Sequence, residues 1–205
     1  MTKKEKLHNL KDEMEKDESL PLKKGANKLV FGSGNTKANI LAVGEGPGRT
    51  EDIQGLPFVG QAGKLLDKLF FLAEIERKDI FITNIVHHRP PENRDPLPEE
   101  IISYGKYLDK IIEIIDPKII ITLGRFSMAK FLSNVFISNV HGKKFEILFK
   151  DKKIVVIPMY HPAASLRNGN ILEAEKQDFL NLKSILTETL RVENDKVEVE
   201  QIKLL

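Results

Sequence analysis

A loop of unusual composition, residues 44–60, joins a short apolar run to a helical pattern. The run is Ile40–Val43, and the pattern has apolar residues at Ala62, Leu65, Leu66, Leu69, Phe70 and Ala73. Glycines in such a loop let the backbone turn with positive φ and let a ligand approach closely. Ligands of open α/β sheets bind beyond the carboxyl ends of the strands. We therefore expect the carboxylates and the single aromatic residue of this loop, Phe58, to form part of a site, rather than a turn whose charges are only solvated.

Strand-like and helix-like segments alternate along the rest of the chain. Further β-branched runs lie at 80–86, 118–123 and 154–158, and helical patterns lie at 62–74, 99–115, 125–132 and 172–190. This alternation predicts an α/β fold of three layers, α/β/α, with a central, mainly parallel four-stranded sheet. Residues 135–150 suggest a hairpin that turns at 141–144 or at 150–152.

One domain is expected to span residues 1–205, because a chain of this length fits a single domain with an ample core. Residues 1–21 form an N-terminal helical and loop segment, in which the first sixteen residues have the pattern of an amphipathic helix. The charged, alternating tail 192–205 is either an added edge strand or disordered.

Composition excludes several classes of site. The chain has no cysteine, so disulfides, thiolate metal sites and a cysteine nucleophile are excluded. The net charge is only +2, so any surface that binds nucleic acid must be locally basic. The sequence contains neither a transmembrane span nor a secretory signal, and we expect a cytoplasmic protein with no membrane contact.

Three polar loops follow three of the four predicted strands, at 44–60, 83–94 and 159–168. In a parallel sheet all three meet at one edge. They contain glutamates, an amide, a histidine, an aromatic ring and arginines, which can together read a base edge, stack on a base and hold phosphates. That set of groups suits a flipped nucleotide held in a pocket.

These loops resemble those of the family-4 uracil-DNA glycosylases. The resemblance covers residues 22–183 and depends on six motifs in order: Gly-Glu-Gly-Pro-Gly from 44, Glu51-Asp52, Gly-x-Pro-Phe-Val-Gly-x-Ala-Gly from 55, Thr83-Asn84, Arg-Pro-Pro-x-Asn-Arg-x-Pro-x-Pro-Glu-Glu from 89, and His-Pro-Ala-x-x-Leu-Arg-Asn from 161. It implies a monofunctional glycosylase that hydrolyses the N-glycosidic bond of deoxyuridine in single- or double-stranded DNA and leaves an abasic site for base excision repair.

The resemblance also implies roles for individual residues. Asn84 would read the edge of uracil, Phe58 would stack on the base, and Gly46 and Gly48 would line the base site. His161 would stabilise the departing uracil anion. Glu45 and Glu51 would each position water or offset the positive charge of the sugar, and Glu51 has the alternative of excluding the methyl group of thymine.

Contacts to DNA are expected from the loop after the fourth strand and from the loop after the second. Leu166 would wedge into the duplex where the nucleotide leaves. The other predicted DNA-binding residues are Ser165, Arg167, Asn168, Arg89 and Arg94. We expect the protein to act on DNA as a monomer.

The sequence departs from the family in one respect. The family normally carries a four-iron cluster on four cysteines, and the corresponding positions here are Asp17, Leu20, His88 and Tyr104. Aspartate and histidine can bind metal, but leucine and tyrosine make a substitute zinc site unfavourable. We therefore predict no metal and no cofactor, with side-chain packing in place of the cluster.

The superfamily offers two other activities. One branch of the superfamily captures abasic sites covalently with a histidine in a Lys-Arg-Arg-Ile-His loop, a sequence that is absent here. The alternative is a DNA-binding member that lost catalysis together with its cluster. Glu45, Asn84 and His161 are all present, and this favours an active enzyme.

Overall fold

A six-stranded sheet forms the centre of the protein in the order β1-β3-β2-β4-β6-β5. The computed structural model describes the backbone of residues 1–203 and the side chains of residues 1–191. The inner strands are β3 (Ile80–Asn84), β2 (Ile40–Gly44), β4 (Ile119–Leu123) and β6 (Lys152–Met159), and each pairs in parallel with its neighbour. This confirms the four parallel strands predicted from the sequence.

The sheet is nevertheless larger than the four strands predicted. At one edge β1 (Ser33–Gly34) pairs antiparallel with β3, and at the other β5 (Phe145–Phe149) pairs antiparallel with β6. Of the two turns predicted for the hairpin, the one at Lys150 and Asp151 is present, and both residues have the positive φ of a type I′ hairpin turn. The residues before β5 instead include a short helix, α6 (Ile137–Val140).

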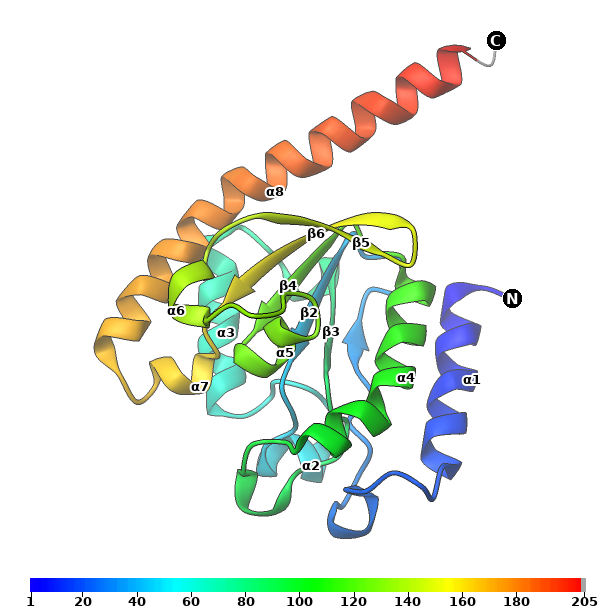
Figure 1. Cartoon of the computed structure of the whole chain (residues 1–205), viewed down its shortest axis with the longest axis vertical. Helices are drawn as coiled ribbons and strands as arrows, with labels where there is room; N and C mark the ends of the chain where they lie inside the picture. Colours follow the sequence, from blue (N-terminus) through cyan, green and yellow to red (C-terminus); the bar gives the residue numbers. More distant parts are fainter. Residues whose placement is uncertain (204–205) are drawn as a thin grey trace.

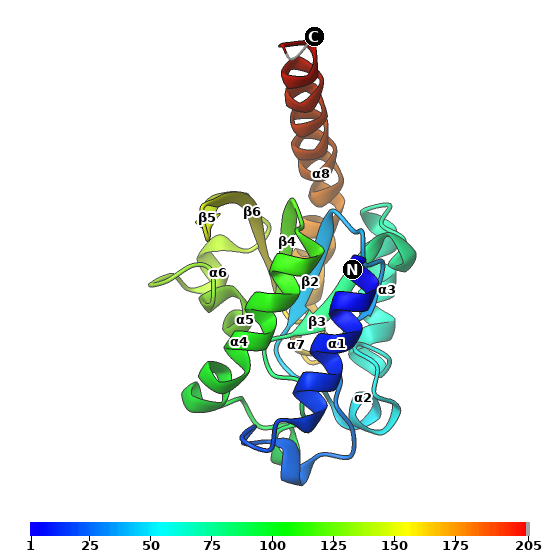
Figure 2. The same ribbon diagram turned by 90° about the vertical axis from the view of Figure 1, so that its right-hand side faces the viewer.

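Alternate strand residues face opposite layers of helices. On one side, Leu41 and Val43 join the core with α1 (Lys3–Lys16) and α4 (Pro98–Ile115), and on the other, Ile40 and Ala42 pack with α3 (Gln61–Leu72) and α8 (Gly169–Lys203). Figures 1 and 2 show the sheet between these helix pairs. Parallel strands buried on both faces account for the near-continuous apolar runs in the sequence.

Three shorter helices follow strands or loops at the carboxyl edge of the sheet. They are α2 (Arg49–Gln54), α5 (Arg125–Ala129) and α7 (Pro162–Ser165). Single turns of tighter helix lie at Lys23–Gly25, Arg77–Asp79 and Pro91–Asn93. Because the four inner strands end at this edge, the loops that follow them converge there.

The last helix, α8, excludes one of the two alternatives for the tail. It continues to Lys203 and projects beyond the sheet in Figure 1, so residues 192–203 do not form an added edge strand; residues 204–205 lie outside the described part. Within residues 1–203, none of the helices combines the length and the hydrophobicity needed to cross a bilayer.

Candidate active site

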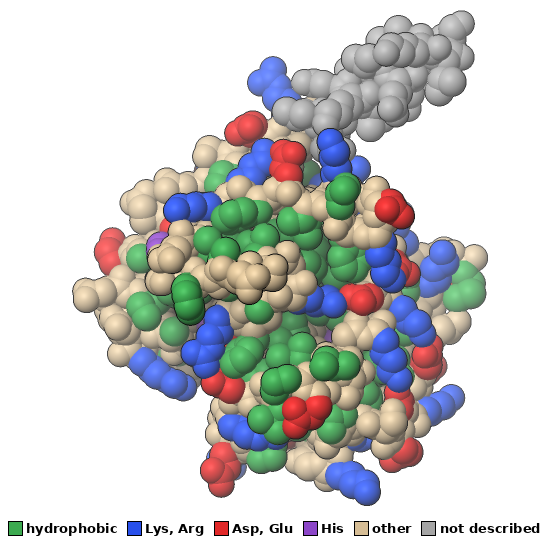
Figure 3. Space-filling view, viewed as in Figure 1, with side chains coloured by type: hydrophobic (Ala, Val, Ile, Leu, Met, Phe, Trp, Pro, Cys, Tyr) green, Lys and Arg blue, Asp and Glu red, His purple; other side chains and the backbone are tan. Residues whose placement is uncertain are grey.

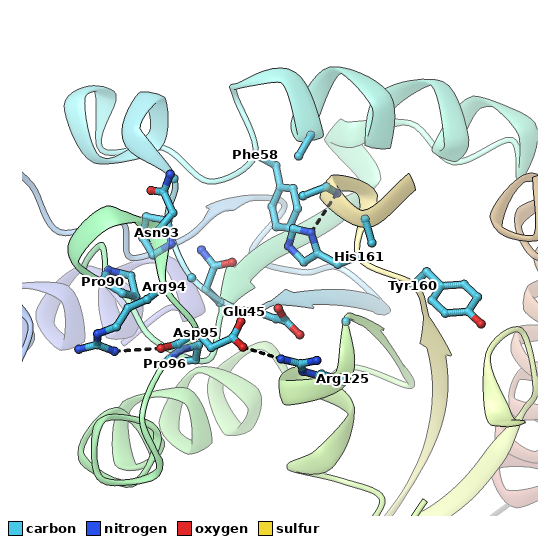
Figure 4. A pocket seen from close by; sticks show the side chains of 18 of the residues that line it. Glu45, Phe58, Pro90, Asn93, Arg94, Asp95, Pro96, Arg125, Tyr160 and His161 are labelled. Carbon is cyan, nitrogen blue, oxygen red and sulfur yellow. Dashed lines mark hydrogen bonds and ion pairs between the residues drawn. The ribbon is translucent and has the colours of Figure 1, made fainter. Parts of the chain in front are cut away.

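A cavity of about 660 Å³ opens at the carboxyl ends of the inner strands. Its walls come from the loops after β2, β3, β4 and β6, as the close view in Figure 4 shows. The predicted site residues that line it are Glu45, Gly46, Gly48, Glu51, Phe58, Asn84, Arg94, His161 and Arg167. Residues more than a hundred positions apart in the sequence therefore meet in one site.

Asn84 ends β3 with its side chain buried, 1% exposed. Its Oδ1 atom has no hydrogen-bond partner, although a buried polar atom usually has one. Gly44 lies opposite Asn84 on β2, and a Cβ atom there would come within 2.4 Å of that oxygen and 2.6 Å of the Phe58 ring. Glycine at 44 therefore leaves room for Asn84 and Phe58, and the free acceptor marks a place for a ligand donor.

Phe58 is held in a left-handed backbone conformation, with φ of 52°. Arg77 donates from Nη2 to the carbonyl oxygens of Pro57 at 2.7 Å and Phe58 at 2.8 Å. Glu51 accepts hydrogen bonds from the next two backbone N–H groups, those of Val59 at 2.9 Å and Gly60 at 2.7 Å. These bonds from both sides hold a bulky residue in a conformation that it rarely adopts.

The ring of Phe58 lies against that of His161, with centroids 5.8 Å apart and planes at 30°. His161 is the N-cap of α7, and its Nδ1 atom accepts a hydrogen bond of 3.1 Å from the backbone N–H of Ala163. Burial, together with the charge of Arg167, lowers the pKa of His161 to about 4. The ring is therefore neutral at physiological pH with its proton on Nε2, because Nδ1 must be the acceptor.

Glu45 follows β2 and faces the start of α5. Burial raises the pKa of its carboxyl to about 7, although the backbone N–H of Phe126 donates to it at 2.9 Å and the charge of Arg125 acts in the opposite direction. Gly124 has a φ of 111°, and a Cβ atom at this position would come within 2.3 Å of the Glu45 Oε1 atom. Glycine at 124 therefore leaves room for the Glu45 carboxyl. The Glu45 carboxyl is thus enclosed, and its protonation state depends on burial, on the Phe126 N–H group and on the charge of Arg125.

The two predicted arginines after β3 already have partners within the protein. Arg94 donates to both carboxylate oxygens of Glu100, at 2.8 and 2.5 Å, and to the carbonyl of Asp95 at 2.9 Å. Arg89 donates from Nε to Asn93 at 2.7 Å. Both therefore brace the loop between β3 and α4 in this conformation. Their predicted contacts with DNA stay predictions.

The predicted DNA-binding residues around α7 lie in different environments. Leu166 is 52% exposed. Ser165 is buried and its hydroxyl donates to Glu175 of α8. The Asn168 side chain accepts from the backbone N–H groups of Asn170 and Ile171, and so caps the start of α8.

Sequence reasoning missed Arg77, Arg125 and Asp95. Arg77 supports Phe58 from a separate turn, and Arg125 and Asp95 form an ion pair of 2.5 Å at the rim of the cavity. No local motif marks these residues, because their partners lie in other loops.

The four positions that correspond to the cluster cysteines do not suit an iron–sulfur cluster, because none supplies a thiolate. The Nδ1 atom of His88 lies 2.8 Å from the Tyr104 hydroxyl, and both side chains are buried, as is Leu20. Asp17 instead accepts from Lys106 at 2.7 Å and from the Tyr107 hydroxyl at 2.8 Å. Across the described residues, no three His, Asp or Glu side chains are grouped to hold a metal ion.

Comparison with known proteins identifies the family. The model of the uracil DNA glycosylase superfamily matches residues 31–182. The type-4 uracil-DNA glycosylase of Archaeoglobus fulgidus is 46% identical over 164 residues, which cover 77% of this chain and 82% of that protein. The type-4 uracil-DNA glycosylase of Saccharolobus solfataricus is 43% identical, and the match covers 88% of this chain and 87% of that protein. The type-4 uracil-DNA glycosylase of Thermotoga maritima is 40% identical, and the match covers 82% of this chain and 86% of that protein. The chain therefore belongs to the type-4 uracil-DNA glycosylases of the uracil-DNA glycosylase superfamily.

Proposed function

We propose that the protein excises uracil from DNA by hydrolysing the N-glycosidic bond of a flipped deoxyuridine, with the roles below for its residues. The observation that carries the proposal is the buried, unpartnered Oδ1 atom of Asn84 beside the ring of Phe58. A free acceptor next to an aromatic face, in a cavity at the ends of the strands, suits a planar base with an N–H on its edge.

Asn84 and Phe58 read the base in this proposal. The Asn84 carbonyl accepts from uracil N3–H, and its amide donates to O4. Cytosine presents an acceptor at N3 and an amino group at position 4, so both contacts would be reversed. Gly46 and Gly48 line the same cavity and let the backbone of this loop approach the base closely.

His161 acts on the leaving group. As the glycosidic bond breaks, negative charge develops on the uracil, and the Nε2–H of a neutral imidazole donates to its O2 atom. A donor already held in place by the cap of α7 requires little reorganisation during the reaction. The sugar meanwhile gains oxocarbenium character, and ionised Glu45 offsets that charge and positions the attacking water.

Glu51 has a different role from Glu45 in this proposal. Its carboxylate accepts from Val59 and Gly60 and so holds the segment that presents Phe58. This makes Glu51 a positioning residue and leaves Glu45 as the carboxylate that faces the reaction. On the DNA side, exposed Leu166 and Arg167 would enter or flank the duplex, while Ser165, Asn168, Arg89 and Arg94 keep their loops in shape.

Substitution of Asn84 tests the proposal. Asn84→Ala should lose most of its cleavage of a single-uracil oligonucleotide, with discrimination against cytosine reduced by about 1–3 kcal/mol. Affinity for DNA should persist, because phosphate contacts supply most of it. A matched control is Asn93→Ala, since this amide lines the same cavity but its oxygen already accepts from Arg89. Unchanged base selectivity in Asn84→Ala would refute the assignment.

Product analysis separates this activity from its alternatives. A hydrolytic glycosylase leaves a site that alkali cleaves and no protein–DNA adduct. A covalently trapping protein leaves an adduct that survives denaturing electrophoresis, and an inactive one leaves intact DNA. Several expectations stay predictions: that the protein is a single domain, that it is a cytoplasmic monomer without a cofactor, and that it acts on single- or double-stranded DNA. Elemental analysis of the purified protein checks the cofactor.

A further inference from the structure

The basic groups near the cavity are few. On the face shown in Figure 3, lysine and arginine side chains are interspersed with aspartate and glutamate, in keeping with the net charge of +2. Binding of the phosphate backbone must therefore depend on individual side chains at the rim. Three arginines line the cavity: Arg94, Arg125 and Arg167.

Arg94 and Arg125 differ in how firmly they are held. Arg94 is bound through both terminal nitrogens to Glu100, whose side chain is only 6% exposed. Among the side chains that the structure describes, Arg125 forms an ion pair only with Asp95, and the two side chains are 61% and 63% exposed. Exposed ion pairs of this kind contribute about 0.2–1 kcal/mol, so a better anionic partner displaces them readily. Arg94 is thus held within its own loop by Glu100, whereas Arg125 is free to exchange Asp95 for another anion.

Arg125 also occupies a suitable position. It is the first residue of α5, directly after the Gly124 turn that packs on Glu45, and Figure 4 shows it reaching across the cavity to Asp95 on the opposite loop. Its guanidinium lies 4.7 Å from the centroid of the Phe126 ring, which supports one side of it. A phosphate next to a nucleotide in the cavity would lie within reach of this group.

We propose that Arg125 binds a DNA phosphate adjacent to the flipped nucleotide, and that it exchanges Asp95 for this phosphate when DNA enters. The inference rests on the proposed function and adds a binding residue to it. In free protein, Asp95 neutralises Arg125 and holds it at the rim. In the complex a phosphate accepts two N–H groups of the guanidinium, a geometry that suits arginine better than lysine.

The experiment measures affinity for an oligonucleotide that contains 2′-deoxy-2′-fluorouridine, whose glycosidic bond resists cleavage, by fluorescence anisotropy over a range of salt concentrations. Arg125→Gln should weaken binding by about tenfold. It should also reduce the slope of log K against log salt by about 0.9 on a duplex or 0.7 on a single strand. Arg125→Lys should restore the slope, because it restores the charge, while recovering only part of the affinity.

Asp95→Asn should have the opposite effect and strengthen binding by up to about fivefold, the upper range for an exposed ion pair. That gain should shrink in the Arg125→Gln background, because Asp95 acts on DNA largely through Arg125. A matched control is Lys152→Gln, which breaks a similarly exposed pair with Asp116 at the opposite end of the sheet and should change neither affinity nor slope.

An unchanged affinity and salt slope in Arg125→Gln would overturn the proposal. A gain from Asp95→Asn that persists in full without Arg125 would overturn the exchange. The proposed function fails by a separate criterion, when the unaltered protein leaves uracil-containing DNA without alkali-labile sites.

Discussion

The backbone N–H of Ala163 donates to the Nδ1 atom of His161, and this one bond sets both the position and the protonation pattern of the imidazole. With Nδ1 an acceptor and the pKa lowered to about 4, Nε2 is a neutral N–H donor over the physiological range. The same residue caps α7, so its structural and chemical roles must be separated by experiment.

His161→Ala should lower the single-turnover cleavage rate by roughly a hundredfold or more, by analogy with the loss of an oxyanion donor. Binding should change much less, because the donor's contact strengthens only in the transition state. His161→Asn keeps a good capping side chain and should be equally slow while preserving the stability of α7. Exposed His8 on α1 provides the control substitution. A parallel fall in affinity and rate would instead assign His161 to holding the loop.

Glu45 should impose a pH dependence on catalysis. Its pKa is raised to about 7, so the ionised form that offsets the sugar's charge is lost as pH falls through that value. The single-turnover rate should therefore rise about tenfold per pH unit below the inflection and level off above it. Glu45→Gln should be slow and lack the inflection. Glu51→Gln should weaken the loop that carries Phe58 yet keep the inflection. An inflection that survives in Glu45→Gln would exclude this assignment.

Glu175 should make stability depend on pH. Burial raises its pKa to about 7 from an ordinary 4.5, although the Ser165 hydroxyl donates to it. The folded state then binds more protons than the unfolded state between these values, so the free energy of unfolding falls as pH rises from 4.5 to 7. Glu175→Gln should remove this loss and be more stable than the unaltered protein at pH 8 by roughly 1–3 kcal/mol.

Denaturant titration at several pH values measures this difference, with exposed Glu173→Gln on the same helix as the control. Equal stability of Glu175→Gln and the unaltered protein at pH 8 would show that the buried carboxyl carries no such penalty.

His88 and Tyr104 form a hydrogen-bonded pair at two of the positions where the family has cluster ligands, and this pair should contribute to the stability of the fold. Tyr104→Phe removes the partner of buried His88 and should lower the free energy of unfolding by about 1–3 kcal/mol. Burial lowers the pKa of His88 to about 4, so the imidazole stays neutral and needs this hydrogen bond. Tyr107→Phe is the matched control, because this equally buried tyrosine donates its hydroxyl to Asp17, whose side chain is 15% exposed, and not to His88. An unchanged free energy of unfolding in Tyr104→Phe would show that His88 does not depend on Tyr104.

Much of the fold follows from local patterns. Apolar runs such as Ile119–Leu123 and the helical spacing of Leu66, Leu69 and Phe70 predict strands and helices, because each periodicity matches one type of element. The two-residue strand β1 was missed, since two residues carry no period, and its place depends on pairing with β3. The alternating charges of the tail resemble a strand, whereas the chain continues as α8 to Lys203.

The residue types of the site were also evident from the sequence, which by itself determined that Glu45, Asn84 and His161 lie at or just after the ends of three of the four parallel strands. The tertiary structure decided what each group is free to do. Arg94 is committed to Glu100 while Arg125 pairs loosely with Asp95, and Glu45 is bonded to Phe126, 81 residues away. The availability of a charge or a lone pair depends on its partners and burial, and these come from parts of the chain that meet only on folding.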